Sequence, residues 1–126
     1  LAAQVLAYPP MDPACRAQSF RRNPEMFPSR AGLLAAWQDY RGTGRRHPVA
    51  YSTPYEAQDL GGVAPAILAV GTLDPVADDV RDYARRLRSA EVPVEMREFE
   101  GMPHGTFLND PALRHWLGTT YARRAA

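Results

Sequence analysis

The sequence predicts an α/β fold: a doubly wound, mostly parallel sheet of about three strands with flanking helices. Three short apolar runs, at residues 4–8, 66–71 and 92–99, have the length of strands buried in such a sheet. Segments with helical periodicity follow the second and the third run. Because strands that alternate with helices are typical of parallel sheets, this order predicts the α/β class.

The amino-acid composition narrows the class of protein further. The 126 residues fit one domain, and 45% hydrophobic with 23% charged residues is ordinary for a globular protein. Fifteen basic and fourteen acidic residues leave a charge of +1, which gives no electrostatic reason to expect nucleic acid or a membrane surface as partner. The single cysteine, Cys15, allows neither an intrachain disulfide nor a thiolate metal cluster. No run approaches the roughly twenty apolar residues of a membrane span, and no signal peptide is visible, so we expect a cytoplasmic protein.

The first strand is expected at residues 4–8, where an apolar run is stopped by Pro9 and Pro10. The segment 11–28 contains three further prolines and is predicted to be irregular. It is nevertheless too apolar for a plain linker, so it is expected to cover another part of the molecule. The side chains that indicate this are Phe20, Met26 and Phe27.

A helix is expected after Ser29, which is a suitable N-cap. Arg41 and Gly42 end it, since glycine suits the position after a last helical turn. Residues 43–62 are predicted to form a loop. The apolar positions of the helix recur at helical spacing: Leu33, Leu34, Trp37 and Tyr40.

The second strand, 66–71, leads into the clearest helix, at 75–90. This helix has acids in its first turns and arginines in its last, as the helix dipole favours. One face is expected to be buried: Val76, Val80, Tyr83, Ala84 and Leu87.

The third strand, 92–99, alternates apolar and polar residues as a half-exposed edge strand does. After it, Asp110 can cap a last helix with Pro111 in the first position. That helix is expected to bury Leu113, Trp116, Leu117 and Tyr121.

Three strands make a thin sheet, and its first strand begins almost at Leu1. A parallel sheet is normally flanked by further strands, and an open apolar edge is seldom left unpaired. We therefore expect residues 1–126 to be the C-terminal portion of one larger α/β domain.

Two loops carry the residues with the clearest chemistry. Asp74 follows the second strand and His104 follows the third. Each alone has a structural explanation: Asp74 as a helix cap before Pro75, and His104 as an exposed loop histidine. Together they would meet at the carboxyl ends of parallel strands, where α/β proteins bind ligands. A carboxylate that orients an imidazole matches the last two members of a Ser-Asp-His triad, in the same chain order.

These motifs resemble the C-terminal portion of the hormone-sensitive-lipase-like α/β-hydrolases, the fold-3 esterases and lipases. The resemblance rests on Y-P-P-M-D at 8–12, S-T-P-Y at 52–55, L-D-P-V-A-D-D at 73–79 and G-M-P-H-G-T-F at 101–107. It implies an α/β-hydrolase fold, with Asp74 as triad acid and His104 as general base. Asp78 matches the family's second acid and would support the loop.

The resemblance also implies that residues 12–46 contribute to a cap over the acyl pocket. Phe27 and Trp37 are then candidate substrate-binding residues, together with Phe20 and Leu34. Plain packing of a helix onto the body of the protein explains these four side chains equally well.

The family's G-x-S-x-G nucleophile motif and its H-G-G-G-type oxyanion loop do not occur in the sequence. Both are expected upstream of Leu1. The chain is therefore predicted to be the acid-and-base half of a serine carboxylic-ester hydrolase, inactive without its N-terminal half. The expected partners are a small ester and that missing half; no metal or organic cofactor is implied, and a homodimer is left open.

Two alternatives remain at this point. One is a non-catalytic small-molecule-binding protein, or pseudoenzyme, on the same scaffold; an intact pair of Asp74 and His104 argues against it. The other is an unrelated small doubly wound domain that is complete in 126 residues.

Overall fold

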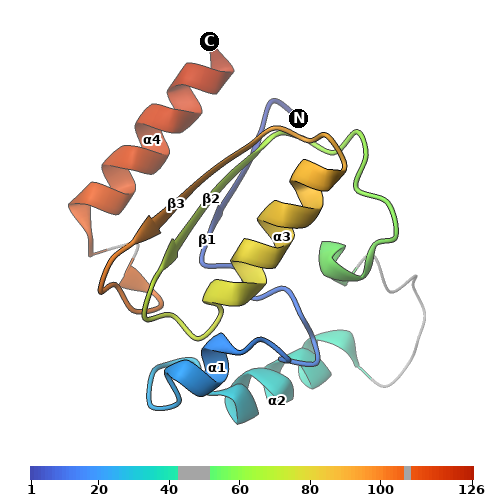
Figure 1. Ribbon diagram of the computed structural model, residues 1–126, viewed down its shortest axis with the longest axis vertical. Coiled ribbons are helices and arrows are strands. Elements are labelled where there is room, and N and C mark those ends of the chain that lie inside the picture. The colour runs from blue at the N-terminus through green and yellow to red at the C-terminus, as the bar shows by residue number, and fades with distance from the viewer. Residues whose placement is uncertain (43–51, 107–108) are drawn as a thin grey trace.

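The computed structural model describes residues 1–42, 52–106 and 109–126. Its centre is a parallel sheet in the order β1-β2-β3, formed by Gln4–Ala7, Ala66–Gly71 and Val94–Phe99. Gln4 is paired with Ala66 and Ala66 with Val94, so the three strands start level and end at one edge. The predicted parallel α/β class is confirmed (Figure 1).

Two helices cover opposite faces of the sheet. Helix α3 (Ala77–Ser89) lies on one face and α4 (Pro111–Ala125) on the other, as Figure 1 shows. Strand β2 is buried throughout and serves both faces, because alternate side chains of a strand point in opposite directions. Leu68 packs with the α3 side, whereas Ile67 packs with Leu113 and Leu117 of α4.

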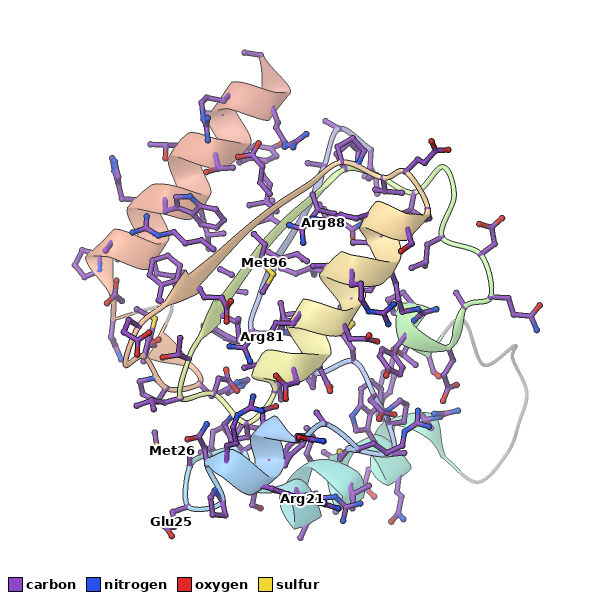
Figure 2. All side chains as sticks on the ribbon, in the orientation of Figure 1. Arg21, Glu25, Met26, Arg81, Arg88 and Met96 are labelled. Carbon is purple, nitrogen blue, oxygen red and sulfur yellow. The ribbon has the colours of Figure 1, made fainter. Side chains whose placement is uncertain are left out.

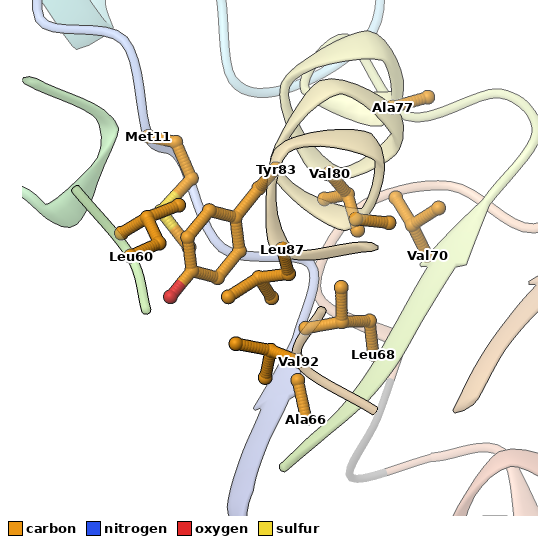
Figure 3. Close-up of a cluster of buried hydrophobic side chains, with 11 residues drawn as sticks. Met11, Leu60, Ala66, Leu68, Val70, Ala77, Val80, Tyr83, Leu87 and Val92 are labelled. Carbon is orange, nitrogen blue, oxygen red and sulfur yellow. The ribbon is translucent and has the colours of Figure 1, made fainter. Parts of the chain in front are cut away.

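The larger core lies between α3 and the sheet (Figure 3). All five apolar residues predicted to face inward from this helix are buried. Met11, from the segment after β1, is buried among them and fixes that segment to the body of the protein. Burying a side chain of this size contributes about 1.5–3 kcal/mol.

The segment after β1 is more regular than its sequence suggests. It contains a four-residue helix, α1 (Ser19–Arg22), which was not predicted because four residues carry no helical period. Together with α2 (Arg30–Arg41) it lies at the carboxyl end of the strands, below the sheet in Figure 1. In Figure 2, Arg21 and Glu25 mark the outer side of this segment.

Helix α2 confirms its predicted cap, since the Ser29 hydroxyl accepts the N–H of Gly32 at 3.1 Å. The helix buries no residue fully; Leu33, Leu34 and Trp37 are half-buried against Cys15, Phe20 and Val76. Tyr40, which was expected on the apolar face, is 67% exposed and touches only the edge of the Trp37 ring among the aromatic residues described.

The predicted loop 43–62 lies outside the described residues up to position 51. From Ser52 onward it is irregular apart from a short 3₁₀ turn, η2 (Pro54–Glu56). Arg86 of α3 fixes this turn by donating to the carbonyl oxygens of Tyr55 and Ala57.

Two other boundaries differ from the prediction. Helix α3 begins at Ala77 because Pro75 and Val76 form a turn held by the Asp74 carboxylate. Strand β3 begins at Val94, after Pro93, which has no N–H for a ladder bond.

The prediction that Tyr121 is buried is wrong: this side chain is 45% exposed. Thr120 takes the inward position one residue earlier and is fully buried. Trp116 is half-buried, with its ring 6.1 Å from the Phe99 ring. No helix in the described ranges is long and apolar enough to cross a membrane.

Candidate active site

Asp74 sits in the turn between β2 and α3 and is completely buried. Its backbone N–H donates to the Gly71 carbonyl at 3.2 Å, which closes the turn directly after the strand. Its Oδ1 accepts the N–H of Val76 at 2.9 Å, so one carboxylate oxygen prepares the start of α3. The second oxygen, Oδ2, points to the neighbouring loop.

His104 reaches that oxygen from the loop after β3. This loop contains Gly101 at φ +69° and Gly105 at φ +76°, a left-handed backbone conformation that glycine adopts without strain. The loop also crosses close over the end of β2. A Cβ on Gly71 would lie 1.9 Å from the Met102 carbonyl oxygen, so only glycine leaves room for the crossing.

The two side chains form a hydrogen-bonded pair, with His104 Nδ1 2.7 Å from Asp74 Oδ2. An ionised carboxylate can only accept, so Nδ1 donates and the lone pair of the ring lies at Nε2. Asp74 has no exposed surface, whereas the His104 side chain keeps 15%. The pair therefore presents an oriented imidazole base at the carboxyl edge of the sheet.

Among the described residues, two aromatic rings contact the imidazole of His104. The Tyr8 ring, from the end of β1, lies 4.9 Å away between centroids, and the Phe27 ring lies 5.7 Å away in an edge-on arrangement. Phe27 is 75% exposed, although it makes this contact. Of the two side chains predicted to bind substrate, the structure brings Phe27 to the pair, while Trp37 packs against the cluster of Cys15, Phe20 and Val76.

Cys15, in the same cluster, is buried at a left-handed backbone position with φ +48°. Burial raises the pKa of its thiol to about 11, with the charges of Asp79 and Asp12 adding to the effect. The thiolate, which is the nucleophilic form, is therefore scarce at neutral pH. Cys15 is therefore poorly suited to act as a nucleophile.

Asp78 ties α1 to the first turn of α3 by a reciprocal pair of bonds. Its Oδ2 accepts the N–H of Ser19 at 3.0 Å, and the Ser19 hydroxyl accepts the N–H of Asp78 at 3.1 Å. The same hydroxyl donates to the carbonyl of Pro75, next to Asp74. Burial by itself would raise the pKa of Asp78, but hydrogen bonds from Arg22 and Arg81 outweigh it and hold this pKa below its usual value.

Asp79 ties the segment after β1 to the same helical turn. Its Oδ2 accepts the backbone N–H groups of Met11 at 2.9 Å and Asp12 at 3.0 Å. Burial raises the pKa of Asp79 to about 6, despite these two bonds. Asp12 is also buried, but the side-chain bond from Arg16 and the N–H groups of Ala14 and Arg16 overcome the effect of burial and lower its pKa.

Tyr8, Ser19 and Asp79 were not predicted as neighbours of the site. Tyr8 appears in the sequence as the last residue of an apolar run, and Asp79 as an ordinary first-turn acid. The one unusual feature of this turn in the sequence is its two consecutive acids, at 78–79, because a single acid would be enough to interact favourably with the helix dipole. Within the described ranges, no three His, Cys, Asp or Glu side chains are grouped to hold a metal ion.

A parallel sheet with an acid and a histidine joined at the ends of adjacent strands is the organisation found in α/β-hydrolases. Residues 1–108 match the profile of the α/β-hydrolase-fold family, to which the chain therefore belongs. This membership removes the alternative of an unrelated small domain.

The relatives agree with this family. The chain is 42% identical over 57 residues to the carboxylic ester hydrolase LipN and 37% identical over 59 residues to the esterase LipI, both from Mycobacterium tuberculosis. These matches cover 45% and 47% of the chain but 15% and 18% of the relatives. A solved esterase of the bacterial hormone-sensitive lipase family is 26% identical with a TM-score of 0.82, and the match covers 98% of the chain and 42% of that structure.

Proposed function

We propose that the chain is the acid-and-base part of a serine carboxylic-ester hydrolase. The observation that carries the proposal is the 2.7 Å pair of Asp74 and His104 at the carboxyl edge of the sheet. The family and the names of its relatives favour ester hydrolysis over other uses of such a pair. On this proposal, residues 1–126 are the C-terminal portion of a single hydrolase domain.

In the proposed mechanism, a serine from outside these residues attacks the ester carbonyl. His104 Nε2 takes the serine proton and then gives it to the departing alcohol. Asp74 holds the ring in the required tautomer and stabilises the imidazolium. Water, deprotonated by the same nitrogen, then attacks the acyl-enzyme, and the imidazolium returns the proton to the serine oxygen as the carboxylic acid leaves. Oxyanion donors would also come from elsewhere, since the sequence has no H-G-G-G-type loop.

The segment 12–46 is proposed to form part of a cap over the acyl pocket. Supporting this, α1 and α2 lie at the strand ends near the pair (Figure 1), and Phe27 presents a largely exposed ring beside His104. Phe27 would contact the apolar part of the ester, and Trp37 would support α2 behind it. Residues 43–46 of this segment lie outside the described ranges.

The other edge of β1 is proposed to pair with the rest of the domain. Among the described strands β1 pairs only with β2, and Val5 is 41% exposed. Beside it, Val5, Leu117 and Tyr121 line a groove of about 380 Å³ together with Arg114 and Gly118. A further parallel strand would cover this apolar groove. A cytoplasmic location and a homodimer stay predictions that fractionation and sedimentation would test.

The test uses the full-length polypeptide that contains this chain, with p-nitrophenyl butyrate as substrate. His104→Ala is expected to lower kcat by about 10²- to 10⁴-fold, because general acid–base catalysis contributes that much. His115→Ala is the matched control, since His115 is exposed on α4. Unchanged hydrolysis in His104→Ala would refute the proposed role of the pair.

A further inference from the structure

The position of Tyr8 against His104 depends on how the chain leaves β1. The Tyr8 N–H donates to the carbonyl of Ala69 at 2.6 Å, which is the last bond of the strand pair. Tyr8 itself has φ +43°, a left-handed conformation that a tyrosine rarely adopts without restraint from its surroundings. The restraints on the next residues therefore help to set the direction of the Tyr8 ring, together with the packing of that ring against the core.

One carboxylate holds two of those next residues. Oδ2 of Asp79 accepts the N–H groups of both Met11 and Asp12. On the opposite side, the Thr53 hydroxyl donates to the Met11 carbonyl at 2.7 Å. The Met11 side chain is buried near Tyr83 and Leu60 in Figure 3. The segment 8–12 is thus fixed from α3, from the η2 region and from the core.

Asp79 lies in the turn of α3 that directly follows the Asp74 loop. Asp74 holds His104 on its Nδ1 side, and Asp79 holds the segment that brings Tyr8 to the ring. The two carboxylates that restrain the surroundings of the imidazole therefore come from one short stretch, residues 74–79. A rigid helix start is a better support for such a constellation than two independent loops.

Burial of the Asp79 carboxylate is also energetically unfavourable. It is 3% exposed, and burial, together with the charges of Asp12 and Asp78, raises its pKa to about 6. The titratable groups near it are those two acids and the Cys15 thiol, and the acids are themselves paired with Arg16 and with Arg22 and Arg81. Because the fold disfavours the ionised carboxylate, this group lowers the stability of the protein at neutral pH. Ionisable groups with strongly shifted pKa values concentrate at functional sites.

We propose that Asp79 is a positioning residue: its carboxylate fixes the segment 8–12 so that the Tyr8 ring bounds the His104 imidazole and limits its motion. The catalytic consequence of this positioning rests on the proposed function. The contact itself does not. The bonds that Asp79 accepts are charge-assisted when it is ionised, which makes the restraint stiffer than neutral bonds would.

The test again uses the full-length polypeptide, with tyrosine and histidine labelled for NMR and p-nitrophenyl butyrate as the kinetic probe. Asp79→Ala removes the acceptor, and we expect it to abolish the nuclear Overhauser contact between Tyr8 and His104 and to lower kcat about tenfold with KM within twofold. Asp79→Asn keeps an acceptor oxygen and is expected to retain the contact, with kcat within about threefold. The matched control is Asp82→Asn, three residues further along α3 and partly exposed. It should change neither the Tyr8–His104 contact nor kcat.

A double-mutant cycle separates positioning from general loss of stability. In a Tyr8→Ala background, Asp79→Ala should change kcat by less than about twofold, because the ring that it positions is gone. If Asp79→Ala does not fold, Asp79→Ser takes its place, since its shorter side chain leaves room for water but cannot reach both N–H groups.

The outcomes are distinct. A lower melting temperature with the Tyr8–His104 contact and kcat both unchanged would refute the positioning role. So would an undiminished effect of Asp79→Ala in the Tyr8→Ala background. If instead the contact is lost but His104→Ala does not impair hydrolysis, the positioning stands and the proposed ester-hydrolase function fails.

Discussion

At the scale of single residues, the Asp74 carboxylate divides its two oxygens between structure and site. Oδ1 supports the turn before α3, and Oδ2 holds His104. The helix-cap interpretation and the triad interpretation of this residue are therefore compatible. Glutamate could not replace it simply, because its extra methylene would move both oxygens away from these partners.

The sequence predicted Asp74 and His104 because each has a recognisable setting, a strand followed by a loop. It did not predict Tyr8 or Asp79 as their neighbours. Those contacts depend on a positive φ at Tyr8 and on which side of α3 the segment 8–12 passes. Both are results of tertiary packing, and no local pattern encodes them.

The raised pKa of Asp79 makes a prediction about stability. Below about pH 4 Asp79 is protonated in both the folded and the unfolded state, so its contribution is fully present. As the pH rises from about 4 to about 6, the unfolded state has released this proton while the folded state still holds it, so stability is lost, on the order of 3 kcal/mol for a shift of this size.

Asp79→Asn cannot ionise and should escape this loss. In urea titrations of the full-length protein, the variant is expected to gain stability relative to the natural protein between pH 4 and pH 7. Asp82→Asn serves as control and should show no such gain. A constant difference between Asp79→Asn and the natural protein across this range would contradict the prediction.

At the scale of elements, the site depends on how closely two turns cross. The loop after β3 passes over the end of β2 with the Met102 carbonyl almost in contact with Gly71, and Leu73 N–H donates to that carbonyl at 3.2 Å. The strands and α3 followed from periodicity, within two residues at their ends, and the start of α4 followed from its Asp110 cap. The crossing of the two turns could not be predicted, because a glycine can end a strand for several different reasons.

Gly71→Ala should therefore affect the site more than the fold. The added methyl group cannot fit beside the Met102 carbonyl, so the loop must shift and lengthen the Asp74–His104 bond. We expect kcat for p-nitrophenyl butyrate to fall about 10²-fold, as a displacement of about 1 Å can cause. Gly61→Ala is the matched control and should leave kcat within about twofold, because a Cβ there would meet only the exposed Asp59 side chain.

At the scale of the whole molecule, the described chain has two well-covered faces and an uncovered side. Helices α3 and α4 cover opposite faces of the sheet, whereas Val5 and Tyr121 are exposed along β1 and α4. The chain spans 42% of the solved esterase that it matches. The apolar character of the first strand predicted the uncovered edge. The groove beside it could not be predicted, because it depends on where α4 packs.

The 126-residue chain by itself is accordingly expected to self-associate and to lack esterase activity. An apolar strand edge pairs with any available partner, and the sequence offers no G-x-S-x-G serine. Sedimentation velocity and a p-nitrophenyl butyrate assay on the purified chain check both statements. Hydrolysis by a monomeric chain that is lost in His104→Ala would contradict them.

The adjacent acids at 78 and 79 have a consequence for how this protein tolerates changes in length. Consecutive helical residues point about 100° apart, so Asp78 reaches α1 while Asp79 reaches the segment 8–12. One residue inserted between Asp74 and Asp78 would rotate both carboxylates by that angle and turn each away from its partner. A single insertion or deletion in the stretch from Asp74 to Asp79 is therefore expected to disrupt the site more than a conservative substitution of one residue there.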